Sequence, residues 1–311
     1  MMMDDDNKLT GAIKGIVTEI QRFSLQDGPG IRTTVFLKGC NMHCTWCHNP
    51  ETLKHMPEIM FYPIRCIGCG KCVEVCPEGA HTMGNGKHTI DRTLCVGCGK
   101  CADACYAEAL QLCGKRMSAK QIMDEVEQDK PYYDNSNGGM TISGGECLCQ
   151  SPFVEQLLDA AHEKGIHAAI ETNLSFDFER IEDVLRKCDL VMFDIKLMDD
   201  EAHKTYTGVS NAKVLANAKK LDELGVPFIV RTPLIPGVTD TDENVSAIVD
   251  YIKDMKHLVR YELLNFNTLG GAKYESLSAD NAHADARPLA KARLDELGAI
   301  IDRAGIAGKV V

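Results

Sequence analysis

The chain has 311 residues, 44% of them apolar and 25% charged, which is the composition of an ordinary water-soluble globular protein. Its 45 acidic residues against 34 basic ones give a net charge of −11, which argues against nucleic acid as a partner. No apolar run approaches about eighteen residues, so we expect no membrane span. The opening MMMDDDNKLT is acidic and polar, unlike an export signal, so we expect a cytoplasmic protein.

The predicted elements begin with two strands, at 13–23 and 33–39, separated by the turn sequence DGPG at 27–30. Residues 57–113 then lose periodicity and become rich in Cys and Gly, which indicates an inserted module. From about Ser118 onwards, apolar strands alternate with amphipathic helices. The expected strands are 140–143, 166–171, 189–196, 226–232 and 258–264, and the helices include 152–164, 211–224 (with Asn211 as N-cap) and 289–303.

Strands that alternate with helices and are themselves apolar predict a parallel sheet covered by helices, of the α/β class. About six such units favour a partial or full (β/α) barrel over an open sheet. In a barrel, functional side chains collect where the strands end, at their C-terminal edge.

Fifteen cysteines are the unusual feature of the composition. Thiols in the cytosol stay reduced, so these residues are expected to be metal ligands, catalytic groups or small buried side chains. Eleven of them fall in three tight groups within residues 40–105, which favours metal binding.

Two of the groups repeat the pattern CxxCxxCxxxC, at 66–76 and 95–105. The doubled pattern resembles bacterial two-cluster ferredoxins, in which each fourth Cys ligates the other cluster. The resemblance implies one 4Fe–4S cluster on Cys66, Cys69, Cys72 and Cys105, and a second on Cys95, Cys98, Cys101 and Cys76. The alternative is a pair of structural zinc sites, which usually use two well-separated cysteine pairs.

The third group, Cys40, Cys44 and Cys47, follows the second strand and has only three cysteines. Three thiolates can hold a 4Fe–4S cluster while one iron stays open to another ligand. The pattern resembles the radical S-adenosylmethionine (SAM) superfamily, which cleaves SAM reductively to methionine and a 5′-deoxyadenosyl radical. A haem c attachment site at 44–48 and a zinc knuckle are alternatives, although haem c is usually attached after export.

Motifs along nearly the whole chain resemble the glycyl radical enzyme activating enzymes, the family that includes pyruvate formate-lyase activating enzyme. They are DGPG at 27–30, CxxxCxxCHNP at 40–50, GGE at 144–146, ETN at 171–173, DIK at 194–196 and VRTPLIPG at 230–237. The resemblance implies a partial (β/α)6 TIM-like barrel of the radical SAM type over 1–56 and 114–311. It also implies a ferredoxin-like insert over 57–113, which the larger activases have and the pyruvate formate-lyase enzyme lacks.

The same resemblance implies roles for residues at the strand ends. Gly144, Gly145 and Glu146 would meet the SAM ammonium, and Lys196 the SAM carboxylate. Arg231 would contact SAM or the surroundings of the radical, and Asp27 would help to receive the partner's glycine loop.

A monovalent cation, Na⁺ or K⁺, would sit beside the SAM carboxylate on oxygen ligands. Its ligands would be Glu171, Thr172, the Met192 carbonyl and Asp194, of which Thr172 and Asp194 would also help to bind SAM. Asp194 and Lys196 could instead simply pair at the barrel mouth. The chain departs from the pyruvate formate-lyase enzyme by having Glu171 in place of Asp and Asn267 in place of His.

The expected function is therefore activation of a glycyl radical enzyme, with SAM, three 4Fe–4S clusters and reduced ferredoxin or flavodoxin as electron donor. The expected partner is a dehydratase or a C–N or C–S lyase, in an anaerobic host. Two alternatives stay open: a radical SAM enzyme that attacks a small molecule or peptide directly, and a protein whose clusters only relay electrons. SAM binding would separate the relay from the enzymes.

Overall fold

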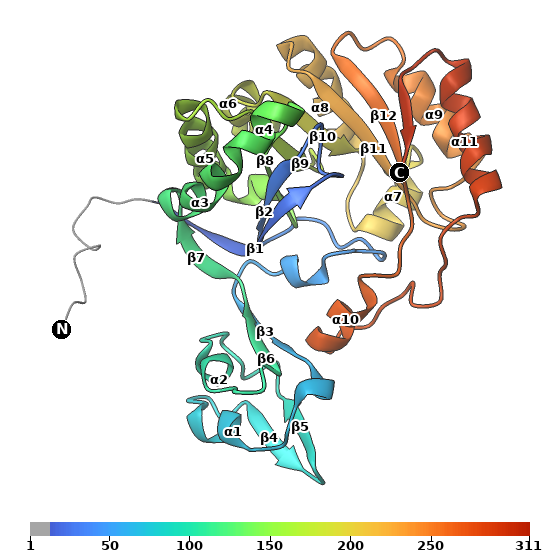
Figure 1. Cartoon of the computed structure of the whole chain (residues 1–311). Helices are drawn as coiled ribbons and strands as arrows, with labels where there is room; N and C mark the ends of the chain where they lie inside the picture. Colours follow the sequence, from blue (N-terminus) through green and yellow to red (C-terminus); the bar gives the residue numbers. More distant parts are fainter. Residues whose placement is uncertain (1–12) are drawn as a thin grey trace.

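One mixed sheet of nine strands organises most of the chain in the computed structural model, which describes residues 13–311 (Figure 1). β1 runs antiparallel to both of its neighbours, β2 and β7, and the other strands run parallel to β2. In order across the sheet the strands are β13 (Gly308–Val310), β12 (Leu258–Asn265), β11 (Phe228–Leu234), β10 (Leu190–Asp194), β9 (Ala168–Thr172), β8 (Gly139–Gly144), β2 (Arg32–Leu37), β1 (Lys14–Ser24) and β7 (Lys115–Ser118).

The predicted α/β class and the parallel order of the later strands are confirmed. β7 and β13 are the two edges, so the sheet formed by residues 13–311 stays open. The predicted strand 189–196 ends two residues early, at Asp194, which leaves Lys196 just beyond the strand end.

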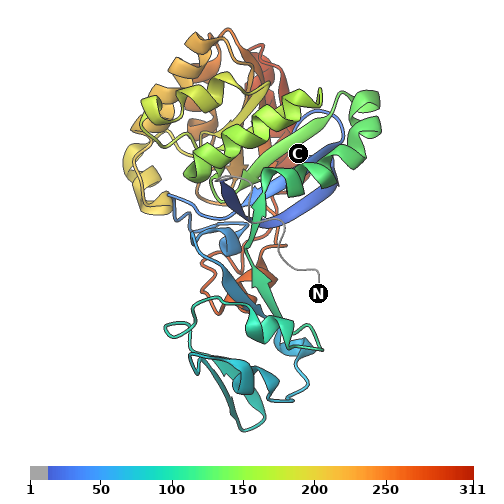
Figure 2. The same ribbon diagram turned by 90° about the vertical axis from the view of Figure 1, so that its left-hand side faces the viewer.

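Helices flank the main sheet along its outer side (Figures 1 and 2). They are α3 (Ala119–Val126), α4 (Lys130–Ser136), α5 (Ser151–Glu163), α6 (Glu182–Arg186), α7 (Asp200–Thr207), α8 (Ala212–Leu224), α9 (Asp242–Ile252) and α11 (Lys291–Arg303), with α10 (Gly271–Leu277) set apart below. Short 3₁₀ turns are η1 (Pro50–Thr52), η2 (Pro63–Arg65), η3 (Glu127–Asp129), η4 (Cys147–Gln150) and η5 (Phe178–Arg180).

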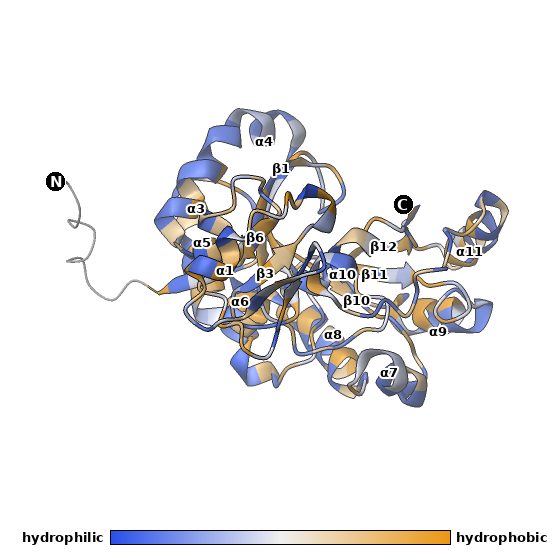
Figure 3. Ribbon diagram, turned by 90° about the horizontal axis from the view of Figure 1, so that it is seen from below, coloured by the Kyte–Doolittle hydropathy of each residue, from blue (hydrophilic) through white to orange (hydrophobic). Residues whose placement is uncertain are grey.

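The core forms where the apolar faces of these helices meet the sheet. On α5, residues Val154, Leu157, Leu158 and Ala161 are fully buried, as the spacing of three and four residues predicts. Figure 3 shows apolar residues concentrated in the strands and on the inner sides of the helices. No helix in the described part of the chain is long and apolar enough to cross a membrane.

Residues 58–113 form a small separate part below the main sheet in Figures 1 and 2. It contains two antiparallel pairs, β3 with β6 and β4 with β5, and two short helices. Their bounds are β3 (Glu58–Phe61), α1 (Lys71–Val75), β4 (His81–Gly84), β5 (Lys87–Ile90), α2 (Lys100–Asp103) and β6 (Leu110–Cys113). The chain enters after η1 and returns to the main sheet through β7.

Candidate active site

The loop at residues 40–47, here called the cluster loop, follows the C-terminal end of β2. Backbone hydrogen bonds fix it on two sides. The Cys40 amide donates to the Leu53 carbonyl at 3.1 Å, and the His43 amide donates to the Thr207 carbonyl at the end of α7 at 2.9 Å. The loop is therefore held between η1 and α7.

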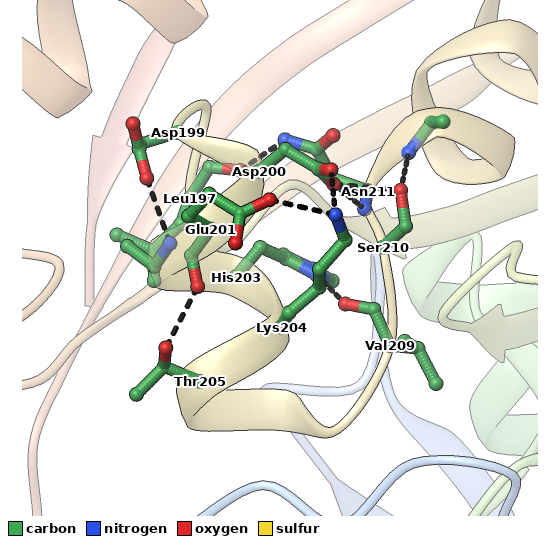
Figure 4. A network of polar contacts seen from close by, with 12 residues as sticks. Leu197, Asp199, Asp200, Glu201, His203, Lys204, Thr205, Val209, Ser210 and Asn211 are labelled. Carbon is green, nitrogen blue, oxygen red and sulfur yellow. Dashed lines mark hydrogen bonds and ion pairs between the residues drawn. The ribbon is translucent and has the colours of Figure 1, made fainter.

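A polar network fixes α7 in turn (Figure 4). Asp200 accepts hydrogen bonds from the Ser210 hydroxyl at 2.6 Å and from the Asn211 amide at 2.9 Å. The Asn211 side chain donates to the carbonyls of Leu197 and Met198, at 3.0 and 2.9 Å. Asn211 is the N-cap of α8, as predicted, but its side chain caps no helix amide because it donates to these two carbonyls instead. The segment after Lys196 is anchored as a result.

The three cluster-loop cysteines are half-buried. The pKa of Cys40 is raised to about 11 and that of Cys47 to about 12, mainly by burial and in part by the neighbouring Cys44. Without a cation to take the negative charge, these thiols stay protonated at neutral pH, whereas a metal ligand must be a thiolate. Three such sulfurs on one preformed loop fit an iron–sulfur cluster with one open iron.

Two glycines at the end of β8 pack against the backbone that precedes and follows the cluster loop. A Cβ on Gly144, whose φ is +127°, would lie 2.0 Å from the Leu37 carbonyl oxygen. A Cβ on Gly145 would lie 2.6 Å from the Gly39 oxygen and 2.8 Å from the Thr52 oxygen. The GG pair is therefore required for the close approach of two backbones.

A Gly145→Ala substitution is expected to displace the cluster loop, because the new methyl group meets backbone atoms that cannot rotate away. Overpacking of this kind costs about 1–3 kcal/mol. We expect a lower melting temperature and loss of iron from the cluster-loop site, measured by anaerobic melting and iron analysis. Gly84→Ala is the matched control, since its Cβ would meet nothing within 4 Å. Equal iron content in both variants would contradict the prediction.

Glu146, the third residue of the motif, joins the ends of β8 and β9. Its carboxylate is 1% exposed and accepts hydrogen bonds from the Leu148 amide at 3.0 Å, the Thr172 hydroxyl at 2.8 Å and the Asn173 amide at 2.6 Å. Burial raises the pKa of Glu146 to about 7, against the effect of these three donors. The structure thus gives the carboxylate a bracing role that the motif did not indicate. Its predicted contact with the SAM ammonium stays a prediction.

Arg231 lies at the centre of a buried group of charges inside the sheet. Its guanidinium pairs with the carboxylates of Glu171 on β9 and Glu262 on β12, the latter at 2.8 Å, and donates to the Gln26 carbonyl at 2.8 Å. Glu171 also accepts a hydrogen bond from Ser143 at 2.5 Å. Sequence reasoning missed Glu262, although one acid within the apolar run LVRYELL was a signal for it.

Lys196 pairs with Asp194 at the end of β10, the arrangement that the simple ion-pair alternative describes. Lys196 is 7% exposed. Burial lowers the pKa of its ammonium, but Asp194 and the Cys44 thiol raise it more, so the amine stays charged. The ion pair with Asp194 leaves the Lys196 ammonium near the cluster loop, since the Cys44 thiol is among the groups that raise its pKa.

The four predicted cation ligands lie on two neighbouring strands, with Thr172 opposite Phe193 in the parallel register. Glu171 and Asp194 carry the two carboxylates, and each already has a cationic partner in Arg231 or Lys196. The oxygen donor set fits a hard monovalent cation. A bound cation would therefore share the carboxylates of Glu171 and Asp194 with the side chains of Arg231 and Lys196.

The DGPG turn folds back towards this group of charges. Asp27 accepts hydrogen bonds from the hydroxyls of Ser24 and Thr34, at 2.6 and 2.7 Å, which hold the turn in shape. Fully buried Arg32 donates to the Pro29 carbonyl at 3.2 Å and to Thr141 at 2.6 Å. Arg32 was not singled out from the sequence, and it fixes the turn from below.

A cavity of about 270 Å³ opens on the other side of the cluster loop. Its walls are the end of the loop, from Trp46 to His48, and the segment that follows β12, including Asn267 and Tyr274. The Tyr274 hydroxyl donates to the Cys47 carbonyl at 2.8 Å. Asn267, the position at which the resemblance expects histidine, lines the same cavity as Cys47.

Seven of the eight cysteines of residues 66–105 fall in two places. A small cavity is lined by Cys76, Cys95, Cys98 and Cys101, the four predicted ligands of one cluster. At the other place, Cys66 and Cys69 are near enough to Cys72 to raise the pKa of its thiol, although burial raises it more. Cysteines from both runs therefore line one cavity, as a swapped fourth ligand requires.

Two histidines that the sequence did not single out lie beside Cys72. The rings of His81 and His88 are 2.8 Å apart at Nδ1 and Nε2, and ligand atoms of both lie within 4.8 Å of Cys72 and of each other. They offer nitrogen donors of the kind that the zinc alternative would use.

Comparison with known proteins identifies the family. The model of the Radical SAM superfamily matches residues 34–249. The chain is 44% identical over 269 residues to the benzylsuccinate synthase activating enzyme of Thauera aromatica, which covers 84% of this chain and 81% of that protein. It is 42% identical over 270 residues to the (2S)-3-sulfopropanediol dehydratase activating enzyme of Klebsiella oxytoca, with 85% of each covered.

A radical SAM methyltransferase from Sphaerobacter thermophilus has a similar fold, with a TM-score of 0.50 at 14% identity over 95% of this chain and 76% of that one. The fold and the three-cysteine loop thus define a protein of the radical SAM superfamily. Within it, the chain belongs to the glycyl radical enzyme activating enzymes and uses radical SAM chemistry. The predicted family and enzyme class are confirmed, and the reading as a mere electron relay is wrong.

Proposed function

We propose that the chain abstracts a hydrogen atom from a glycine of a partner dehydratase, C–N or C–S lyase, or decarboxylase, and so installs the glycyl radical. The observation that carries this proposal is the loop of three half-buried cysteines near the Lys196 ammonium. Two relatives, 42% and 36% identical to this chain, are the activating enzymes of a (2S)-3-sulfopropanediol dehydratase and of an indoleacetate decarboxylase.

Cys40, Cys44 and Cys47 would hold the 4Fe–4S cluster whose open iron binds SAM. When bound, the cluster and SAM supply a single electron and a 5′-deoxyadenosyl radical. Lys196 would neutralise the SAM carboxylate, and Gly144 and Gly145 would let the backbone approach its amino end. The cavity beside Cys47 has room for part of the nucleoside, next to Asn267.

A monovalent cation would bind Glu171, Thr172, Asp194 and the Met192 carbonyl, close to Lys196. The support is that all four residues lie on β9 and β10, next to each other in the sheet. The cation and Lys196 would together hold the SAM carboxylate in place.

The partner's glycine would enter from the side of the DGPG turn. The carbonyl of Gln26, the residue just before this turn, accepts a hydrogen bond from Arg231, which ties the turn to the charged group at the strand ends. Asp27 would contact the glycine loop and hold it in reach, while the packed strands exclude water and other hydrogen donors.

Residues 57–113 would form a ferredoxin-like domain with two further 4Fe–4S clusters, one on Cys66, Cys69, Cys72 and Cys105 and one on Cys95, Cys98, Cys101 and Cys76. The cavity lined by Cys76 and the first three cysteines of the second run supports the swapped ligand pattern. Reduced flavodoxin or ferredoxin would supply the electron.

The test is an anaerobic reaction of the iron-reconstituted protein with SAM, reductant and a panel of glycyl radical enzymes. We expect an electron paramagnetic resonance doublet from a glycyl radical on at least one dehydratase, lyase or decarboxylase, with 5′-deoxyadenosine formed in equal amount. A partner whose radical-site glycine is changed to alanine is the control, and it should give no doublet. A small molecule or peptide that is consumed without any partner protein would instead support the alternative radical SAM enzyme.

A further inference from the structure

Helix α10 contacts both cysteine-bearing parts of the molecule. It packs against η1, which follows the cluster loop, and against β3, the first strand of residues 58–113. Figure 1 shows it between the main sheet and that smaller part. Whatever fixes α10 therefore fixes the two parts relative to each other.

One side of α10 holds the cluster loop and the turn after it. The Tyr274 hydroxyl donates to the Cys47 carbonyl at 2.8 Å. The Lys273 ammonium donates to the Asn49 side chain at 2.6 Å and pairs with Glu51 at 2.7 Å. Three contacts in two successive residues make this a firm attachment.

The last turn of α10 is held by Arg92. Its guanidinium donates to the Ser276 carbonyl at 2.9 Å and to the Ile59 carbonyl on β3. The Cys95 amide donates to the Asp91 carbonyl at 3.2 Å, so Arg92 lies in the turn that begins the second cysteine run. Burial lowers the pKa of Arg92, while Cys95, Glu58 and Cys101 raise it. The Arg92 Nε–H is buried and has no hydrogen-bond partner among the described residues. A sulfur of a bound cluster could accept a hydrogen bond from it.

The two cysteine runs have different surroundings. A Cβ on Gly97, in the second run, would lie 2.1 Å from the Pro57 oxygen, where the chain leaves the main body. In the first run, a Cβ on Gly70 would meet nothing within 4 Å, and one on Gly68 only Met83 at 3.9 Å. Figures 1 and 2 agree, since α2 lies nearer the main sheet than α1 does.

We propose that Arg92 is a positioning residue that docks the second cysteine run onto α10, so that its cluster delivers the electron to the SAM cluster while the first run faces the donor protein. The inference rests on the proposed function of residues 57–113. Each cysteine run would hold one cluster, and these two clusters would carry single electrons from reduced flavodoxin to the cluster that Cys40, Cys44 and Cys47 would hold. Each transfer oxidises one centre and reduces the next, and no bond or proton changes.

The experiment compares Arg92→Met with wild type as reconstituted full-length protein. A nearby cation stabilises the more negative, reduced cluster, so its removal is expected to lower the reduction potential of one insert cluster in a titration followed by paramagnetic resonance. SAM cleavage driven by reduced flavodoxin should slow by about tenfold or more, as loss of an outer contact to a metal site usually does. Cleavage driven by dithionite, which can reduce the SAM cluster directly, should be spared.

Two further variants sharpen the result. Lys87→Met removes a cation from the exposed β4–β5 hairpin and should behave as wild type. Arg92→Lys keeps the charge but not the fork that spans two carbonyls, so the potential should be largely kept while flavodoxin-driven cleavage stays slow.

Unchanged potentials together with unchanged rates in Arg92→Met would overturn the proposal. Equal loss with flavodoxin and dithionite would overturn it too, since it would show a general structural role. Iron analysis of the wild type distinguishes a failure of the proposed clusters from a failure of the proposed role of Arg92. Iron sufficient only for the cluster-loop site would overturn the cluster assignment itself, whereas a full complement with no effect of Arg92 would overturn only the docking role.

Discussion

A Cys44→Ala variant is expected to form 5′-deoxyadenosine from SAM at least about a hundredfold more slowly than wild type, because even the outer partners of metal ligands are worth about 10–100-fold. Cys44 is the middle one of the three proposed ligands, and Cys40 and Cys47 alone would leave the cluster without a third sulfur. The product is measured by chromatography after anaerobic reaction with dithionite.

Cys188→Ala is the matched control. Cys188 is also a buried thiol, but it donates to the Val184 carbonyl in the core and belongs to none of the three groups. Its variant should cleave SAM as wild type does. Wild-type rates in Cys44→Ala, with the iron of residues 66–105 retained, would show that the cluster loop is not the SAM site.

Replacing Arg231 by Met is expected to destabilise the fold by about 3–5 kcal/mol, the usual cost of removing one partner from a buried ion pair. Glu171, 21% exposed at the side chain, would then have no cationic partner, and Glu262, 2% exposed, would keep only Arg260 at 2.6 Å. Anaerobic urea or thermal unfolding measures the change. Since SAM and the glycine loop are expected nearby, activity should fall as well.

The deficit of this variant should depend on pH. Burial already raises the pKa of Glu171 above its usual value, and loss of Arg231 would raise it further. A carboxyl group whose folded pKa is raised stabilises the fold at low pH and loses that contribution as pH rises through the folded value. The difference from wild type should therefore be smaller near pH 6 than near pH 8.

Arg186→Met is the control for an arginine lost from a surface pair. Arg186 pairs with Glu182 four residues away, and both side chains are at least a third exposed. Such pairs contribute about 0–1 kcal/mol, so its unfolding midpoint should barely move. Similar shifts in both variants, or a deficit that does not vary with pH, would contradict the assigned charge network.

Local patterns in the sequence were enough to predict the fold class and the candidate cluster loop. The spacing of Cys40, Cys44 and Cys47 marked the open-iron site, because three ligands at fixed short separations need only one loop. The apolar positions of α5 and the alternation of strands and helices gave the α/β class, since burial of one helix face depends on residues three and four apart. The motifs GGE and DIK predicted functional residues at strand ends, because each motif is short and continuous in the sequence.

Only the tertiary structure decided how distant residues share work. Glu262 lies 91 positions after Glu171, and the sheet places both on Arg231. Glu146 serves as a brace because the parallel register of β8 and β9 sets their ends side by side. Arg92 and Ser276 meet although 184 residues separate them. Such contacts follow from the packing of whole elements, whose relative positions depend on many weak interactions at once, and no local pattern encodes them.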